Sequence, residues 1–182
     1  MAISTPTTAG QILTSAYVNN NINSGLVYIK EQTIGSAVAS VNVTSAFSST
    51  YTNYKIIVAG GTMSAATPLQ LKLGASTTGY AYSLVYASFT TATPLAVVAA
   101  SDSSFVYAGG GDTNGCYANI DLLRPFDAAY TQYSSTTYGL VTTAGFNTGI
   151  HKVATSYTDF TLFPASGTLT GGTITVYGWR KA

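Results

Sequence analysis

The side chains that could do chemistry in this sequence are few and scattered. Hydrolytic acid–base catalysis needs two positioned carboxylates. The whole supply of carboxylates in the 182 residues is Glu31, Asp102, Asp112, Asp121, Asp127 and Asp159. Most of them adjoin turn residues, where Asp ordinarily accepts hydrogen bonds from backbone amides. We therefore interpret these carboxylates as turn residues, and the sequence predicts no enzyme.

His151 and Cys116 are the sole histidine and the sole cysteine. A metal site or a Ser–His dyad would have to be built on His151, whose neighbours indicate a loop or a strand edge. Cys116 follows a glycine loop, with nothing nearby that would lower the pKa of its thiol. We expect Cys116 to be a small buried apolar residue. The sequence thus predicts no cofactor, no metal and no catalytic residue.

The glycine-rich segment from Gly109 to Gly115 also lacks a recognisable binding motif. Asp112-Thr-Asn114-Gly115 resembles the start of a calcium loop, but the later Glu ligand is missing. The glycine triplet 109–111 has neither phosphate-loop frame. We interpret 109–115 as a hairpin loop, with Asn114-Gly115 suited to positive φ. The sequon Asn42-Val-Thr44 carries no weight without a secretory signal.

Composition narrows the function further. Charged residues make up 7% of the chain, against about 25% in ordinary soluble domains. The surface is therefore buried in an assembly, or is a neutral hydroxyl and aromatic contact surface, or belongs to a disordered chain. Disorder is disfavoured because 46% of the residues are hydrophobic. The net charge of +1 gives no electrostatic case for nucleic acid or an anionic membrane, and it favours a homo-oligomer.

The chain shows no sign of secretion or membrane insertion. Its single cysteine excludes an intramolecular disulfide. The N-terminus has neither the basic region nor the apolar region of a signal peptide. No apolar run approaches the roughly 18 residues that would span a bilayer. We expect synthesis in a cytoplasm.

Residues 1–25 differ from the rest. Pro6 blocks a helix near the start, whereas Thr14 or Ser15 can cap a short helix that ends near Ile22. A segment this small cannot bury its apolar residues alone, so it is either a frayed tail or an arm that docks on something. The candidate attachment residues of such an arm are Ile3, Ile12, Leu13, Tyr17, Val18 and Ile22.

Residues 26–182 have the pattern of an all-β domain. In the stretch from Phe47 to Val58, a polar turn precedes a strand that has Tyr54, Ile56 and Val58 on one face. Residues 157–162 repeat this pattern of a turn followed by a strand. Strands are expected at 26–34, 38–47, 54–59, 68–73, 80–89, 95–100, 105–107, 116–123, 130–141, 157–163 and 173–179. About ten short strands predict a jelly-roll-like antiparallel β-sandwich.

Fourteen tyrosines are the remaining candidates for a contact surface. Several, such as Tyr177, would lie on outward positions of their strands. One interpretation is packing between subunits and on half-buried strand surface. The other is contact with a carbohydrate or a cell surface, because Tyr and Trp combine stacking area with a polar tip.

Several motifs, in order along most of the chain, resemble small β-rich virion proteins of tailed bacteriophages. The segment 8–14, Thr-Ala-Gly-Gln-Ile-Leu-Thr, followed by Ala16 and Asn19, resembles the "TAGQVLTAAxxN" start of tail and fibre proteins. The segment 47–56 is similar to the "FSSxYxNYxI" strand entry of marine and cyanobacterial phage proteins. Further similar motifs are Leu69-x-Leu71-x-Leu73-Gly, Thr78-Gly-Tyr80, Tyr157-Thr-x-Phe160 and Gly171-Gly-Thr-Ile-Thr-Val-Tyr-Gly178.

The resemblance implies a non-enzymatic module on the exterior of a virion, usually trimeric, attached through its N-terminal segment. It allows a short fibre or tail-associated protein that contacts a host surface glycan or protein. It equally allows a capsid decoration (cement) or head-fibre protein. The shaft repeats of long fibres are missing, so the expected module is short.

Overall fold

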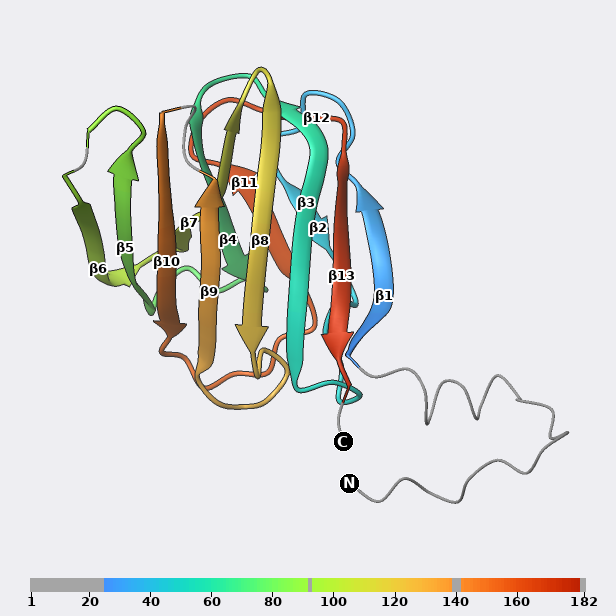
Figure 1. The fold of residues 1–182 in the computed structure, drawn as a ribbon. Helices are drawn as coiled ribbons and strands as arrows, with labels where there is room; N and C mark the ends of the chain where they lie inside the picture. Colours follow the sequence, from blue (N-terminus) through green and yellow to red (C-terminus); the bar gives the residue numbers. More distant parts are fainter. Residues whose placement is uncertain (1–24, 92, 139–141, 181–182) are drawn as a thin grey trace, which may run out of the picture.

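The computed structural model describes residues 25–91, 93–138 and 142–180 as an antiparallel all-β sandwich (Figure 1). This confirms the fold class expected from the alternating pattern. The short helix expected in residues 1–25 lies outside the described residues. Within the described ranges, no apolar helix of membrane-spanning length occurs.

Thirteen strands make up the described part of the chain. They are β1 (Leu26–Thr33), β2 (Val41–Val43), β3 (Asn53–Met63), β4 (Thr67–Leu73), β5 (Tyr80–Ser88), β6 (Leu95–Asp102), β7 (Phe105–Asp112), β8 (Gly115–Leu123), β9 (Thr131–Tyr138), β10 (Thr143–His151), β11 (Phe160–Pro164), β12 (Leu169–Thr170) and β13 (Thr173–Trp179). Every pairing between them is antiparallel.

The strands form two layers of unequal width (Figure 1). The large layer has the order β1-β13-β3-β8-β9-β10-β5-β6. The small layer has the order β2-β11-β4-β7. Hydrogen bonding is continuous between the layers because β7 pairs with β4 and also with β8. The β5–β6 hairpin lies at the far end of the large layer.

The core lies between the layers and is built from alternate residues of each strand. Tyr54, Ile56 and Val58 of β3 are almost fully buried, as the sequence predicts. The rings of Phe105 on β7 and Tyr133 on β9 stack across the layers with centroids 4.1 Å apart. Burial of large apolar side chains is the main stabilising term in such a core.

Several predicted strands have different bounds in the structure, and those expected at 105–107 and 157–163 are β7 (Phe105–Asp112) and β11 (Phe160–Pro164). The strand expected at 38–47 shrinks to β2, with Val38 making only an isolated bridge to Leu169. The strand expected at 54–59 continues past the glycines to Met63 through an irregularity between Val58 and Gly61. A Cβ at Gly61 would lie 2.3 Å from the Gly171 carbonyl oxygen, so glycine here permits close packing and does not end the strand.

The sequence missed β10 and β12. The inward positions of β10 include Gly145, Asn147 and Gly149, so the strand lacks the aliphatic alternation that identifies strands. β12 has only two residues and is held to β3 by tertiary pairing. Neither strand could be recognised from local pattern alone.

The structure confirms a hairpin between β7 and β8 but places the glycine triplet in β7, so the expected loop at 109–115 was too long. A Cβ would lie 2.4 Å from a backbone carbonyl of β8 at Gly109 and 2.2 Å from one at Gly111. The absence of side chains at these glycines therefore lets β7 pack closely against β8. The turn itself is Thr113-Asn114. The Asn114 N–H donates to Asp112 Oδ1 (2.7 Å), which makes an Asx-turn and leaves no role for positive φ.

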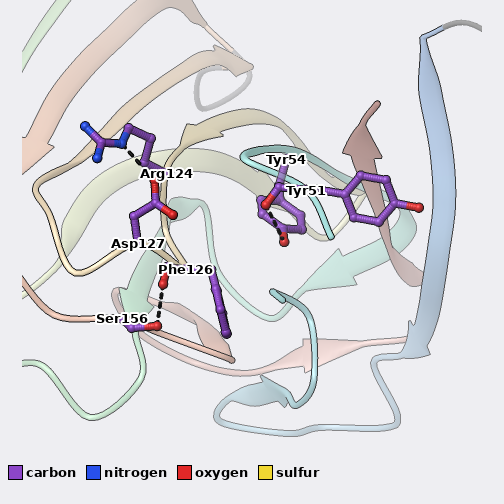
Figure 2. A network of polar contacts seen from close by, with 6 residues as sticks. All are labelled: Tyr51, Tyr54, Arg124, Phe126, Asp127 and Ser156. Atoms are coloured by element: carbon purple, nitrogen blue, oxygen red, sulfur yellow. Dashed lines mark hydrogen bonds and ion pairs between the residues drawn. The ribbon is translucent and has the colours of Figure 1, made fainter. Parts of the chain in front are cut away.

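The hydroxyl of Tyr54 holds the turn that precedes β3. It accepts the N–H of Ser48 (2.8 Å) and lies 2.7 Å from the Ser48 carbonyl, to which it donates. It also contacts the Tyr51 carbonyl oxygen at 3.2 Å, and Figure 2 marks this contact with a dashed line. The Tyr51 ring packs against Gly178, where a Cβ would lie only 2.3 Å from it. This turn is therefore anchored to the core from both ends.

Replacing Tyr54 by Phe should lower the free energy of unfolding by about 1–3 kcal/mol, because the Ser48 amide and carbonyl lose their partner. Chemical denaturation followed by fluorescence measures the change. Tyr28→Phe is the matched control, since the Tyr28 side chain is 60% exposed. Equal stability of the two variants would contradict the anchoring role of the Tyr54 hydroxyl.

Candidate contact surface

His151 at the end of β10 is fully buried and sits beside Ser76 and Thr78. Its Nε2 lies 2.9 Å from Ser76 Oγ and 3.1 Å from the Thr78 carbonyl oxygen. A carbonyl only accepts, so Nε2 carries the proton and cannot serve as a base toward Ser76. Nδ1 is buried and has no partner among the described residues. Burial lowers the pKa of His151, and the Thr78 carbonyl offsets part of that effect.

Cys116 is fully buried on β8, as the sequence predicts. Burial raises the pKa of its thiol to about 11. At neutral pH the thiol is therefore protonated, and the thiolate is the nucleophilic form. In the described part of the chain, no three His, Cys, Asp or Glu side chains lie together in a way that could hold a metal ion.

The aspartates have separate structural roles. Asp102 and Asp112 accept backbone N–H groups of Ser103 and Asn114, which confirms the turn interpretation for these two. Asp121 instead lies within β8 and pairs with Lys55 of β3 at 3.2 Å. Asp127 pairs with Arg124 in the loop after β8, so these four aspartates have separate partners in different parts of the fold.

The outward residues of the large layer form one broad surface, which we call the outer face. Strand register places its residues in rows that cross the layer. One such row contains Tyr28, Tyr177, Lys55, Asp121, Ser134, Thr148, Ser83 and Val98. Tyr177 points outward, as the sequence predicts, and its ring meets that of Tyr28 edge-on. The Lys55–Asp121 pair neutralises the two charges in this row.

Most of the exposed large apolar side chains of the described chain gather on this outer face. Those at its outward strand positions are Leu26, Tyr28, Val85, Val98, Tyr117, Leu123, Phe146 and Trp179. Their neighbours on the same face are hydroxyl and amide side chains such as Asn119, Gln132 and Thr136. An exposed apolar area of this kind commonly marks a contact surface.

A shallow hollow occupies the end of the outer face where β3, β8, β9 and β10 meet. It is lined by Thr52, Asn53, Leu123, Arg124, Tyr130, Gln132 and Ile150. A second depression shares Leu123, Gln132 and Ile150 and extends the hollow toward Asp121, Ser134 and Thr148. The two together make one open groove along the outer face.

The loop after β8 forms the rim of the hollow, and backbone contacts hold it. The Arg124 N–H donates to the Thr52 carbonyl (2.8 Å), and the Arg124 side chain pairs with Asp127 at 2.9 Å. Ser156 donates to the Phe126 carbonyl from the other side (Figure 2). Arg124 has φ of 63°, so the chain turns sharply there. The rim is thus tied to the turn that Tyr54 anchors.

The lining of the groove combines hydrogen-bonding side chains with an exposed ring. Amides from Asn53 and Gln132 offer both donors and acceptors, and Arg124 offers planar donors. Tyr130 is 53% exposed and can stack its ring on an apolar sugar face. The groove is open and shallow, a shape that suits the end or side of an extended ligand.

Sequence reasoning did not identify this groove. Leu123 and Gln132 each follow a buried neighbour, so their outward position is visible from alternation. Leu123 pairs directly with Gln132 across β8 and β9, and Ile150 joins this row from β10, which the sequence missed. The six candidate attachment residues lie outside the described residues: Ile3, Ile12, Leu13, Tyr17, Val18 and Ile22. Comparison with protein-family models, curated proteins and solved structures finds no match for this chain.

The protein should lose stability as the pH falls below about 6.5, the ordinary pKa of histidine. The pKa of His151 is lower in the folded state, so the unfolded chain binds a proton that the folded chain does not. The stabilisation is present above pH 6.5 and is lost as the pH falls toward the folded pKa. Thermal unfolding at pH 7.5 and 5.5 measures it.

His151→Gln is the control, because Gln can still donate to the Thr78 carbonyl but does not titrate. Its melting temperature should change much less between these two pH values. An equally steep loss of stability in this variant would assign the pH dependence to other groups.

Proposed function

We propose that this chain is a non-enzymatic structural protein on the exterior of a tailed-phage virion. In this proposal it is a short fibre or tail-associated module. Residues 1–25 attach it to other virion proteins, and the sandwich contacts a glycan or protein of the host surface. It is made in the host cytoplasm and assembles into the particle without nucleic acid, membrane insertion or cofactor.

The observation that supports host contact is the outer face with its groove. Exposed rings such as Tyr130 and Trp179 lie on or beside a surface of amides and hydroxyls with compensated charge. Aromatic residues, Arg and adaptable polar groups are enriched at recognition surfaces. The motif resemblance supports the virion part of the proposal, and the chemistry of the outer face supports the host contact.

A second candidate function is capsid decoration or a head fibre. The observation that favours it is the exposed apolar end of the large layer, around Val85, Val98 and Phe146. Such a patch fits contact with other protein better than contact with a sugar. The homotrimer that the resemblance implies stays a prediction for both functions.

Deleting residues 2–24 should abolish incorporation of the protein into particles, because the proposal assigns attachment to this segment. Quantitative mass spectrometry of purified virions measures incorporation and copy number together. Particles that contain the truncated protein would contradict the arm as anchor. Copy numbers in the hundreds per particle would favour decoration over a tail fibre.

Replacing both Tyr130 and Gln132 by Ala should weaken binding of the purified protein to host cells about tenfold or more, because a stacking surface and an amide are lost from the groove. Flow cytometry with labelled protein measures binding, and thermal unfolding checks that the fold is kept.

The matched control replaces an aromatic and an amide elsewhere, Phe89 and Asn42. Both are exposed, but Phe89 lies in the β5–β6 turn and Asn42 on β2 of the small layer. Binding of this control should equal that of the unmodified protein. Equal weakening of both variants would remove the groove from the proposal.

A further inference from the structure

The ends of the two layers leave strand edges unpaired. In the described part of the chain, β6 and β1 each have one strand neighbour in the large layer, and β2 has one in the small layer. A free edge presents unpaired N–H and C=O groups, which can pair with another strand. Natural proteins usually block such edges with charges, proline, bulges or very short strands.

β1 and β2 carry these blocking features, and the regular part of β6 does not. β1 contains Lys30 and Glu31 and has a register shift between Tyr28 and Lys30. β2 has only three residues. β6 reads Leu-Ala-Val-Val-Ala-Ala-Ser-Asp, and its only charge is Asp102 at the end.

The regular edge of β6 is the segment 95–99. A register shift against β5 separates it from Asp102. Lys152 Nζ lies 3.4 Å from the Ala100 carbonyl, so a cation also marks that end of the strand. Residues 95–99 pair with β5 in register from Tyr86 to Tyr82, and all five of them are apolar.

Both faces of this segment are accessible. Val98 on the outer face is 74% exposed, and Leu95 on the opposite face is 51% exposed. Val85 and Phe146 continue the apolar surface inward along the next two strands. The edge strand β6 lies at one end of the sandwich (Figure 1), and these exposed side chains belong to that end.

We propose that β6 pairs antiparallel with β6 of a second copy of this chain. A two-fold axis at Val97 places Ala96 opposite Val98 of the second copy and Leu95 opposite Ala99. The contact is isologous, so the unpaired N–H and C=O groups of each β6 edge pair with those of the other. The large layers of the two molecules then form one continuous sheet with a shared outer face.

A second copy is the occupant that fits this edge best. The pairing needs a strand that is apolar on both faces, and β6 itself is such a strand. The net charge of +1 gives little repulsion between copies. Antiparallel pairing also keeps the two Asp102 side chains at opposite ends of the contact. This inference rests on the fold and does not depend on the virion function.

The test compares the full chain with Ala96→Lys/Val98→Lys. In the paired edge each introduced lysine lies directly opposite an introduced lysine of the other copy, and like charges directly across a strand pair destabilise it. The control is Val85→Lys/Ser83→Lys, which adds the same charges on β5, at the partners of Ala96 and Val98. Across the contact these control charges are separated by more than the roughly 8 Å screening length at physiological salt.

Sedimentation equilibrium should give an even number of copies per assembly for both the unmodified protein and the control. This number is two, or six if a three-fold contact also exists. The β6 variant should dissociate at least tenfold more readily. In hydrogen exchange, protection of the 95–99 amides of the unmodified protein should rise with protein concentration.

Three results would overturn the proposal. One is a monomer or a trimer at 100 µM with unprotected 95–99 amides. Another is equal weakening by the control variant. The third is protection that does not change with concentration, which would mean that a segment of the same chain covers the edge. The exchange measurement decides the matter even if a Lys variant fails to fold.

Discussion

The alternation of side chains across each strand is the constraint on which the rest of this structure depends. Once Tyr54, Ile56 and Val58 are buried, Lys55 and Ile57 have to point outward. The stacked rings of Phe105 and Tyr133 hold the two layers face to face, so every strand of the large layer inherits one buried and one open side. The chemistry of the outer face is therefore a consequence of how the core is filled.

The unequal width of the layers explains why apolar side chains are exposed at one end of the large layer. The small layer covers the inward side of most of the large layer, and Tyr80, Tyr82 and Leu84 of β5 are still buried. Beyond them, Leu95 and Val98 of β6 are open on opposite faces. Ala99 of β6 still packs against the core, whereas the exposed Leu95 and Val98 add little to it, which is why we propose this end as a contact surface.

Low charge and local order act together at the groove. Lys55 with Asp121 and Arg124 with Asp127 compensate each other, so hydroxyls, amides and rings dominate the surface. Backbone hydrogen bonds from the Tyr54-anchored turn hold the rim in place. A preformed neutral surface loses little entropy when it binds, which suits recognition of neutral ligands or proteins.

Local sequence determined the all-β class, the strands with aliphatic alternation such as Leu69–Leu73, and the burial of Cys116, because these follow from side-chain period and polarity. It did not reveal β10, whose inward Gly145 and Gly149 allow β5 to approach closely and whose inward Asn147 donates to the Tyr107 carbonyl. Local sequence also placed glycines 109–111 in a loop, whereas in the structure they lie in β7, where they allow close packing against β8. The shared row of the groove and the open edge of β6 were decided by the tertiary structure alone, because strand register and strand order arise from contacts between residues far apart in the chain.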